Sequence, residues 1–245
     1  MLELRALTAA CDNRLENSIC VGCGARAFSV CASLPGDDLV RLDAIAERIV
    51  LAAGDVMARE DEPAASVFNI TAGAVRIYKL MPDGRRQITG FLFAGDFVGL
   101  TAGETYAFSA EAIEETTVCR FRASEYRAVA RERPSLEAAL LSRAMHELTA
   151  AQDQMLLLGR KTARERLASF LVTMLSRDPL RPSGDNAVRL PMTRSEIADY
   201  LGLTIETVSR ELTKLKTSGV IHAVSLHDLR IERPDRLKDM ANGAS

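Results

Sequence analysis

The spacing of hydrophobic positions divides the chain into stretches of different texture. From about Leu34 to Arg122, short apolar runs are separated by glycines, and Val75–Leu80 alternates as a half-buried strand does. The turn sequence Pro82-Asp83-Gly84 precedes a further apolar run, Gln87–Phe93. Many short strands with regular turns predict an antiparallel sandwich or barrel in this part of the chain.

After Pro134 the apolar positions recur at alternating spacings of three and four, as far as about Lys161. This spacing predicts one long helix with a coiled-coil seam. The alternative is a helix whose apolar face packs on its own domain. The predicted dimer interface is Leu141, Ala144, Leu148, Ala151, Met155 and Leu158.

Two short helices with a tight turn between them are predicted near the C-terminus. Thr193 and Glu196 have the spacing of a capping box, and Gly202 suits the turn that ends the first helix. A second helix, Thr204 to Lys216, follows with a buried stripe at Val208, Leu212 and Leu215. This combination predicts a helix-turn-helix that reads double-stranded DNA.

The outward face of the second helix carries side chains suited to a DNA groove. Arg210 can donate two hydrogen bonds to guanine, Glu206 can accept from cytosine, and Ser209 can reach a base edge or a phosphate. Lys214 and Thr193 are predicted to contact the DNA backbone. The alternative is that Glu206 and Arg210 form only a surface ion pair.

Charge and symmetry refine this prediction. The formal net charge is −2, so DNA binding has to depend on a local basic surface rather than on overall attraction. A protein with one reading helix per chain usually binds DNA as a twofold dimer. We therefore favour a homodimer over the self-packed alternative for the long helix.

Four of the five cysteines form a pattern that indicates metal chemistry. Cys20, Cys23 and Cys31 have the spacing C-x2-C-x7-C, and Cys119 lies far from them at the end of a predicted strand. Four soft ligands suit an iron–sulfur cluster or an all-thiolate zinc site, and spacing alone does not choose between the two. Cys11 either replaces one of these four ligands or does not bind the metal, and we favour the second alternative.

The segment Glu206-Thr-Val-Ser209-Arg210 resembles the Glu-x-x-Ser-Arg signature of the FNR branch of the CRP/FNR regulators. Gln87–Phe91, Gly95–Gly99 and Gln154–Leu158 resemble the same branch. The resemblance implies an α+β fold with a cupin-like, cyclic-nucleotide-binding-type β-roll, a long dimerisation helix and a winged helix-turn-helix. The corresponding ranges are 1–33 for a Cys-rich cluster-binding segment, 34–133 for the β-roll, 134–161 for the helix and 162–245 for the DNA-binding domain.

The resemblance also implies how the protein works. The DNA site would be a palindrome of TTGAT-like half-sites, in which Arg210 reads the G and Glu206 the C of the paired strand. The loop Met81 to Arg86 resembles a region that contacts RNA polymerase in relatives, which favours activation. FNR-type oxygen sensors hold a [4Fe-4S] cluster with three N-terminal cysteines and one central cysteine, here Cys20, Cys23, Cys31 and Cys119. The alternative is a regulator without a cluster that responds to thiol oxidation or to another effector.

The sequence lacks the residues that other classes of function would require. A cyclic-nucleotide sensor needs a Glu where Gly99 stands and an Arg within Phe108-Ser109-Ala110. The three histidines, His146, His222 and His227, lie outside the predicted sensor, which disfavours haem, and no catalytic motif for an enzyme is present. No apolar stretch approaches the roughly 20 residues of a membrane helix, and the N-terminus lacks a signal pattern, so a cytoplasmic location is expected.

Overall fold

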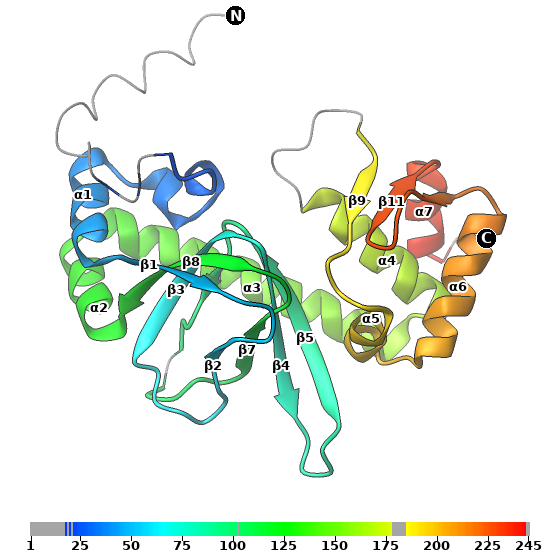
Figure 1. Ribbon diagram of the computed structural model, residues 1–245, viewed down its shortest axis with the longest axis horizontal. Coiled ribbons are helices and arrows are strands. Elements are labelled where there is room, and N and C mark those ends of the chain that lie inside the picture. Colours follow the sequence, from blue (N-terminus) through cyan, green and yellow to red (C-terminus); the bar gives the residue numbers. More distant parts are fainter. Residues whose placement is uncertain (1–17, 19, 21, 102, 178–184, 244–245) are drawn as a thin grey trace, which may run out of the picture. The chain divides into compact units, whose positions relative to one another are not determined.

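The computed structural model describes residues 18, 20, 22–101, 103–177 and 185–243 (Figure 1). The chain forms two compact units. The first takes in the chain up to Lys79 and Gly90–Glu147, and the second takes in Leu80–Thr89 and the chain from Leu148 onward. Cys11 lies outside the described residues.

The first unit is built on two four-stranded sheets, with strand orders β1-β8-β3-β6 and β2-β7-β4-β5. The pairings β1–β8, β3–β8, β3–β6, β2–β7 and β4–β7 are all antiparallel. The predicted antiparallel roll is therefore confirmed. The strands are β1 (Glu47–Leu51), β2 (Val56–Ala58), β3 (Ser66–Ala72), β4 (Ala74–Leu80), β5 (Arg86–Phe93), β6 (Phe97–Val98), β7 (Ser109–Ala112) and β8 (Thr116–Arg122).

Helices cover one face of the β1-β8-β3-β6 sheet. Two short 3-10 turns, η1 (Arg26–Phe28) and η2 (Val30–Ser33), precede helix α1 (Gly36–Ile45), and helix α2 (Ala123–Glu132) follows β8. Successive side chains of β3 and β8 point to opposite faces of the sheet and pack in two different hydrophobic cores, as the two-residue period of a strand requires. Phe68, Ile70 and Val118 pack inside the roll. The opposite core packs against the helices and contains Val67, Cys119, Phe121, Tyr126 and Leu136.

Helix α3 (Pro134–Arg160) is continuous over 27 residues and leads from the first unit into the second. The second unit then contains α4 (Ala163–Ser176), α5 (Arg194–Leu201), α6 (Ile205–Thr217) and α7 (Pro234–Ala241). A three-stranded sheet of order β10-β11-β9 completes it, formed by β9 (Ala187–Arg189), β10 (Ile221–Ala223) and β11 (Asp228–Ile231). The predicted α+β fold with a C-terminal winged helix-turn-helix is confirmed. Among the described helices, none is long and apolar enough to cross a membrane.

Candidate DNA-reading helix and cysteine-lined cavity

The turn between α5 and α6 is set by caps that the sequence encodes locally. Thr193 accepts a hydrogen bond from the Glu196 amide at 3.2 Å, and the Glu196 carboxylate accepts one from the Thr193 amide at 2.7 Å. Both halves of the predicted capping box are thus present at the start of α5. Gly202 ends α5 with φ of 60°, and Thr204 caps α6 by accepting from the Thr207 amide at 3.2 Å. The helix-turn-helix is therefore fixed by its own residues.

Helix α6 has one buried and one exposed face. Val208, Leu212 and Leu215 are buried as predicted. Glu206, Arg210 and Lys214 are exposed on the other face, and Ser209 is half-buried. The helix therefore presents its polar side chains where a DNA groove would meet them.

Arg210 and Glu206 have local partners other than each other. Arg210 donates to the Thr207 hydroxyl at 3.3 Å, and the ion pairs of the described residues do not join Arg210 to Glu206. The pKa of the Glu206 carboxyl is lowered by a hydrogen bond from its own backbone amide and by one from the Thr204 hydroxyl. Glu206 is thus held as an anionic acceptor at the start of α6, as contact with a cytosine amino group requires.

Lys214 and Thr193 are also held within the protein. Lys214 donates to the Glu211 carboxylate at 2.7 Å, and Arg164 of α4 lies 3.8 Å from the same carboxylate. Glu211 is only 7% exposed, so its charge needs these cations. Glu211 was not among the residues predicted from the sequence, although a Glu three residues before a Lys on a helix indicates such a pair. The Thr193 hydroxyl also donates to Glu196 at 2.8 Å, which ties it into the cap.

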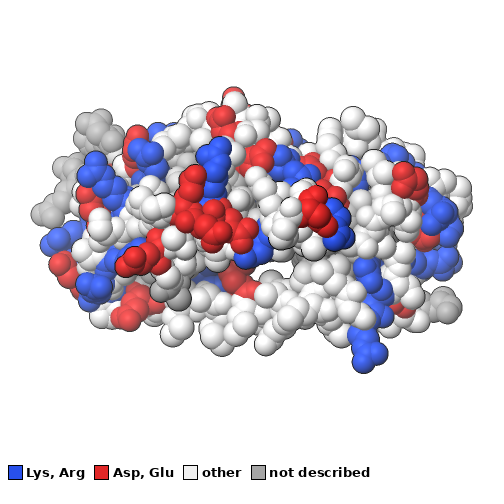
Figure 2. All heavy atoms as spheres, turned by 90° about the horizontal axis from the view of Figure 1, so that it is seen from below, with Lys and Arg blue, Asp and Glu red and all other residues white. Residues whose placement is uncertain are grey.

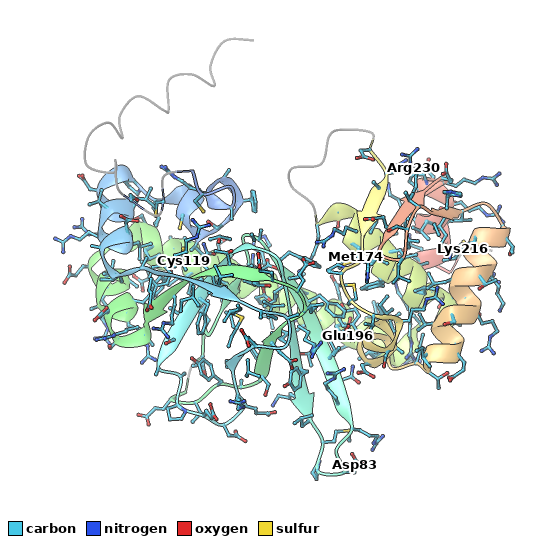
Figure 3. All side chains as sticks on the ribbon, viewed as in Figure 1. Asp83, Cys119, Met174, Glu196, Lys216 and Arg230 are labelled. Atoms are coloured by element: carbon cyan, nitrogen blue, oxygen red, sulfur yellow. The ribbon has the colours of Figure 1, made fainter. Side chains whose placement is uncertain are left out.

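The basic surface that DNA binding needs is local. Figure 2 shows Lys and Arg side chains gathered at the end of the second unit that carries α6. Figure 3 places Lys216 on α6 and Arg230 on β11 of the wing sheet. Lys216 lies at the end of the reading helix itself and Arg230 on the wing sheet, positions that suit contacts to DNA phosphates.

The four cysteines of the predicted ligand set line one cavity of about 20 Å³ in the first unit. Cys20, Cys23 and Cys31 come from the N-terminal segment, and Cys119 comes from β8 on the face that this segment covers (Figure 3). None of these four is in a disulfide. The remaining lining residues are Arg26, Leu39, Leu42, Ala46, Asn69 and Phe121.

Burial keeps three of the four thiols protonated. Removal from water raises the pKa of Cys20 to about 12, with a further rise from a hydrogen bond to Asp43. The same burial raises the pKa of Cys119 to about 11, with the neighbouring Cys23 and Cys31 adding to the rise. The pKa of Cys31 is also raised by burial. The four thiols line the same cavity, so ionisation of one disfavours ionisation of its neighbours.

Four cysteine thiols are a suitable ligand set for a thiolate-bound metal group. In this structure, however, their sulfur atoms are not arranged as they would be around a bound metal. In the described part of the chain, no three Cys, His, Asp or Glu side chains lie together as a ready metal site. A cavity of about 20 Å³ has room for about one water. A cluster would therefore require the Cys20–Cys31 segment to move outward. The described part of that segment has short-range backbone hydrogen bonds, such as the Arg26 amide to the Cys23 carbonyl at 3.2 Å and the Leu34 amide to the Cys31 carbonyl at 3.3 Å.

The N-terminal segment also packs beside the first half of α3. A cleft of about 550 Å³ is lined on one side by Phe28–Val30 and Ala32, and on the other by α3 residues from Ser135 to His146. A Cβ atom at Gly95, where φ is 94°, would lie 2.5 Å from the Phe28 ring. Only glycine allows this approach, so the Cys-bearing segment packs through Phe28 directly against the backbone of Gly95.

Most of the predicted dimer seam on α3 is exposed in the single chain. Leu141, Leu148 and Met155 are 64%, 52% and 67% exposed, and Ala144 and Ala151 are exposed beside them. Leu158 differs because it is half-buried. Met145 and Leu156 extend the exposed apolar surface and were missed by the strict seam pattern. The helix thus does not use this face to pack on its own unit.

Comparison with known proteins identifies the fold. The family model of the cyclic nucleotide-binding domain matches residues 48–133, and that of the Crp-like helix-turn-helix domain matches residues 165–240. The nitrogen fixation regulation protein FixK of Bradyrhizobium diazoefficiens is 40% identical over 91% of this chain and 93% of its own length. The chain belongs to the CRP/FNR family of transcription regulators.

Further matches place it in the FixK-type branch of the CRP/FNR family. The transcriptional activator protein FnrL of Cereibacter sphaeroides is 39% identical over 82% of this chain and 83% of its own length. The solved structure of FixK2 from Bradyrhizobium japonicum matches with a TM-score of 0.76 and 39% identity, covering 82% of this chain and all of that one. The protein is therefore a DNA-binding regulator and not an enzyme.

The match to the cyclic nucleotide-binding domain shows the fold of the roll and not its ligand. Gly99, where a nucleotide sensor would need a Glu, has φ of 99°, and a Cβ atom there would lie 2.8 Å from the Ser66 carbonyl oxygen. A longer side chain would therefore be strained at this position. The roll retains the family fold without those ligand-binding residues.

Proposed function

We propose that this protein is an oxygen-responsive transcription activator, binding a palindromic TTGAT-like site as a homodimer while Cys20, Cys23, Cys31 and Cys119 hold a [4Fe-4S] cluster. The convergence of these four cysteines on one cavity carries the proposal. Cys119 lies 88 positions after Cys31 in the chain, yet both line this cavity. The names of relatives such as FnrL support the activator part.

When bound, such a group supplies an oxygen-labile link between thiolates. The positions of the four cysteines determine which parts of the chain that link would connect. Cys20, Cys23 and Cys31 would tie the N-terminal segment to β8 through Cys119. Their deprotonation has to accompany binding, because burial keeps Cys20, Cys31 and Cys119 neutral in the free protein.

A hydrophobic path leads from the cysteines to the dimer helix. Val30 and Leu34, on either side of Cys31, pack in one core with Tyr126 of α2 and Leu136 of α3. Leu140 lies against the same core, one residue before the seam begins at Leu141. Closely packed side chains transmit displacement. A change in the position of the Cys-bearing segment would therefore shift the start of the seam.

The DNA contact follows from α6. In a twofold dimer each α6 would enter one half-site, with Arg210 donating to guanine and Glu206 accepting from cytosine. The Met81–Arg86 loop, which joins β4 to β5, has Met81 exposed at 44% and is proposed to contact RNA polymerase.

The same thiols fit a simple redox switch poorly. A reactive cysteine has a lowered pKa, because the thiolate is the nucleophile. Here the pKa values of Cys20, Cys31 and Cys119 are raised. The convergence of four cysteines on one cavity is the observation that favours the cluster over a cluster-free regulator that responds through one or two of these thiols.

The test is purification without oxygen, followed by iron and sulfide assays, an absorbance spectrum and DNA binding before and after air. We expect a coloured protein with about four iron and four sulfide per chain, whose tight DNA binding is lost in air. Cys119→Ser should abolish the colour, and Cys11→Ser should keep it. Colourless protein, or protein with zinc only, would contradict the cluster, and DNA binding unchanged by air would contradict oxygen control.

A further inference from the structure

Asn69 is a buried polar residue that faces the cysteine cavity. It lies in β3, directly opposite Cys119 in β8 in the antiparallel register. Side chains of residues paired in this way lie on the same face of the sheet, with Cβ atoms about 5 Å apart. Val67, two residues earlier in β3, packs in the same core as Cys119, which confirms this orientation. Asn69 therefore points at the cavity beside the Cys119 sulfur.

The side chain of Asn69 lacks the partner that its burial calls for. Asn69 is 2% exposed, and its Oδ1 atom has no hydrogen-bond partner in the structure. Buried polar side-chain atoms are nearly always paired, because leaving one unpaired costs stability. An apolar residue of similar size would fill this position at lower cost, as Leu39, Leu42 and Phe121 do elsewhere around the cavity.

The chemistry of the cavity indicates what the amide would meet. Among the residues that line it, Asn69 is the one neutral side chain with an N–H donor, since the others are apolar, thiol or the cation Arg26. A carboxamide presents either its oxygen or its NH2 group after a half-turn about its last torsion. Thiolate and sulfide sulfurs accept hydrogen bonds, and such bonds set the reduction potential of iron–sulfur groups.

We propose that the Asn69 side chain donates a hydrogen bond to sulfur at the Cys119 corner of the cluster and makes the cluster more resistant to dioxygen. This inference rests on the proposed function, and Asn69 would be a hydrogen-bond donor to the cluster rather than a ligand of its iron. A donor aimed at sulfur stabilises the state with more negative charge. Loss of the donor should therefore lower the reduction potential and hasten loss of the cluster in air.

The test compares three variants with the wild type after anaerobic reconstitution with ferrous iron and sulfide. Asn69→Leu removes the donor at similar size, and Asn69→Ser keeps a shorter donor. Val67→Ala loosens the same face of the same strand without touching the cavity lining, and so controls for packing. Iron and sulfide content, reduction potential and the rate at which the cluster absorbance fades in air are measured for each.

We expect Asn69→Leu to lose its absorbance about 10-fold faster than the wild type, with a lower reduction potential. Asn69→Ser should lie between the two, and Val67→Ala should match the wild type. If Asn69→Leu loads no cluster while Val67→Ala loads fully, the amide is required for assembly, which also supports the proposal. Equal rates and potentials in Asn69→Leu and the wild type would overturn it, as would equal losses in Asn69→Leu and Val67→Ala. A wild type that takes up no iron and sulfide would instead contradict the proposed function.

Discussion

Arg210 is the side chain on which the proposed reading of the DNA half-site depends most. It is exposed on α6 and is oriented by the Thr207 hydroxyl at 3.3 Å. Glu206, one helical turn earlier, keeps its negative charge through hydrogen bonds at the helix start. The two side chains are thus preorganised separately, which leaves both available for base edges.

We predict that Arg210→Ala weakens binding to the TTGAT-like site by about 1–3 kcal/mol, or roughly 5- to 150-fold. The loss should be much smaller on a half-site whose G is replaced, because the lost contact is specific to that base. Binding curves on both sites, over a range of salt, measure this.

Lys216→Ala provides the matched control for Arg210, since Lys216 is an exposed cation in the last turn of the same helix. It should weaken binding to both sites alike and lower the salt dependence by about one charge. If Arg210→Ala behaves in the same way as Lys216→Ala, Arg210 contacts phosphate and does not read the base.

At the scale of elements, α4 and α5 start with the same capping box. Thr162 and Glu165 cap α4, and Thr193 and Glu196 cap α5. The two boxes should contribute similarly to stability, because each satisfies free amides at a helix start. Only Thr193 is also predicted to contact DNA, so the pair separates the two roles.

We predict that Thr193→Ala and Thr162→Ala each lower the free energy of unfolding by about 1 kcal/mol. Thr193→Ala should in addition weaken DNA binding, whereas Thr162→Ala should not. Chemical denaturation and binding titrations measure the two effects. Equal DNA affinities in the two variants would restrict Thr193 to its capping role.

The ends of a helix or strand can be predicted from the sequence where nearby caps and turn residues determine them. The strand predicted at Val75–Leu80 is β4, Ala74–Leu80, and the helix predicted from Thr204 to Lys216 is α6, Ile205–Thr217, with Thr204 as its cap. Turn residues and caps act over three or four positions, so they can be read directly. The ion pair of Glu211 with Arg164 of α4 and the partial burial of Leu158 depend on other elements, so local patterns do not predict them.

At the scale of the whole molecule, the exposed face of α3 has an energetic consequence. Leu148 is 52% exposed near the middle of a line of apolar side chains. A twofold interface buries each such residue twice, once from each chain. Ala150, two residues later, is also exposed but lies off the seam positions.

We predict that Leu148→Glu weakens dimerisation roughly 100-fold, because two leucines lose burial worth about 1.5 kcal/mol each and two like charges are brought together. Ala150→Glu adds the same charge to the same helix and should leave the dimer intact. Analytical ultracentrifugation over a range of concentrations measures both. A dimer that persists in Leu148→Glu would show that another surface joins the chains.

The sequence by itself determined the helix-turn-helix, its caps, the outward face of α6 and the membership of the CRP/FNR family. Each depends on residues a few positions apart, or on a contiguous motif such as Glu206–Arg210. The family resemblance had grouped Cys119 with Cys20, Cys23 and Cys31, but only the tertiary structure decided that the four line one cavity. This arrangement depends on the β3–β8 register and on the close packing of Phe28 against Gly95. Such long-range pairing is chosen by burial over the whole unit, so no local pattern could have placed Asn69 beside Cys119.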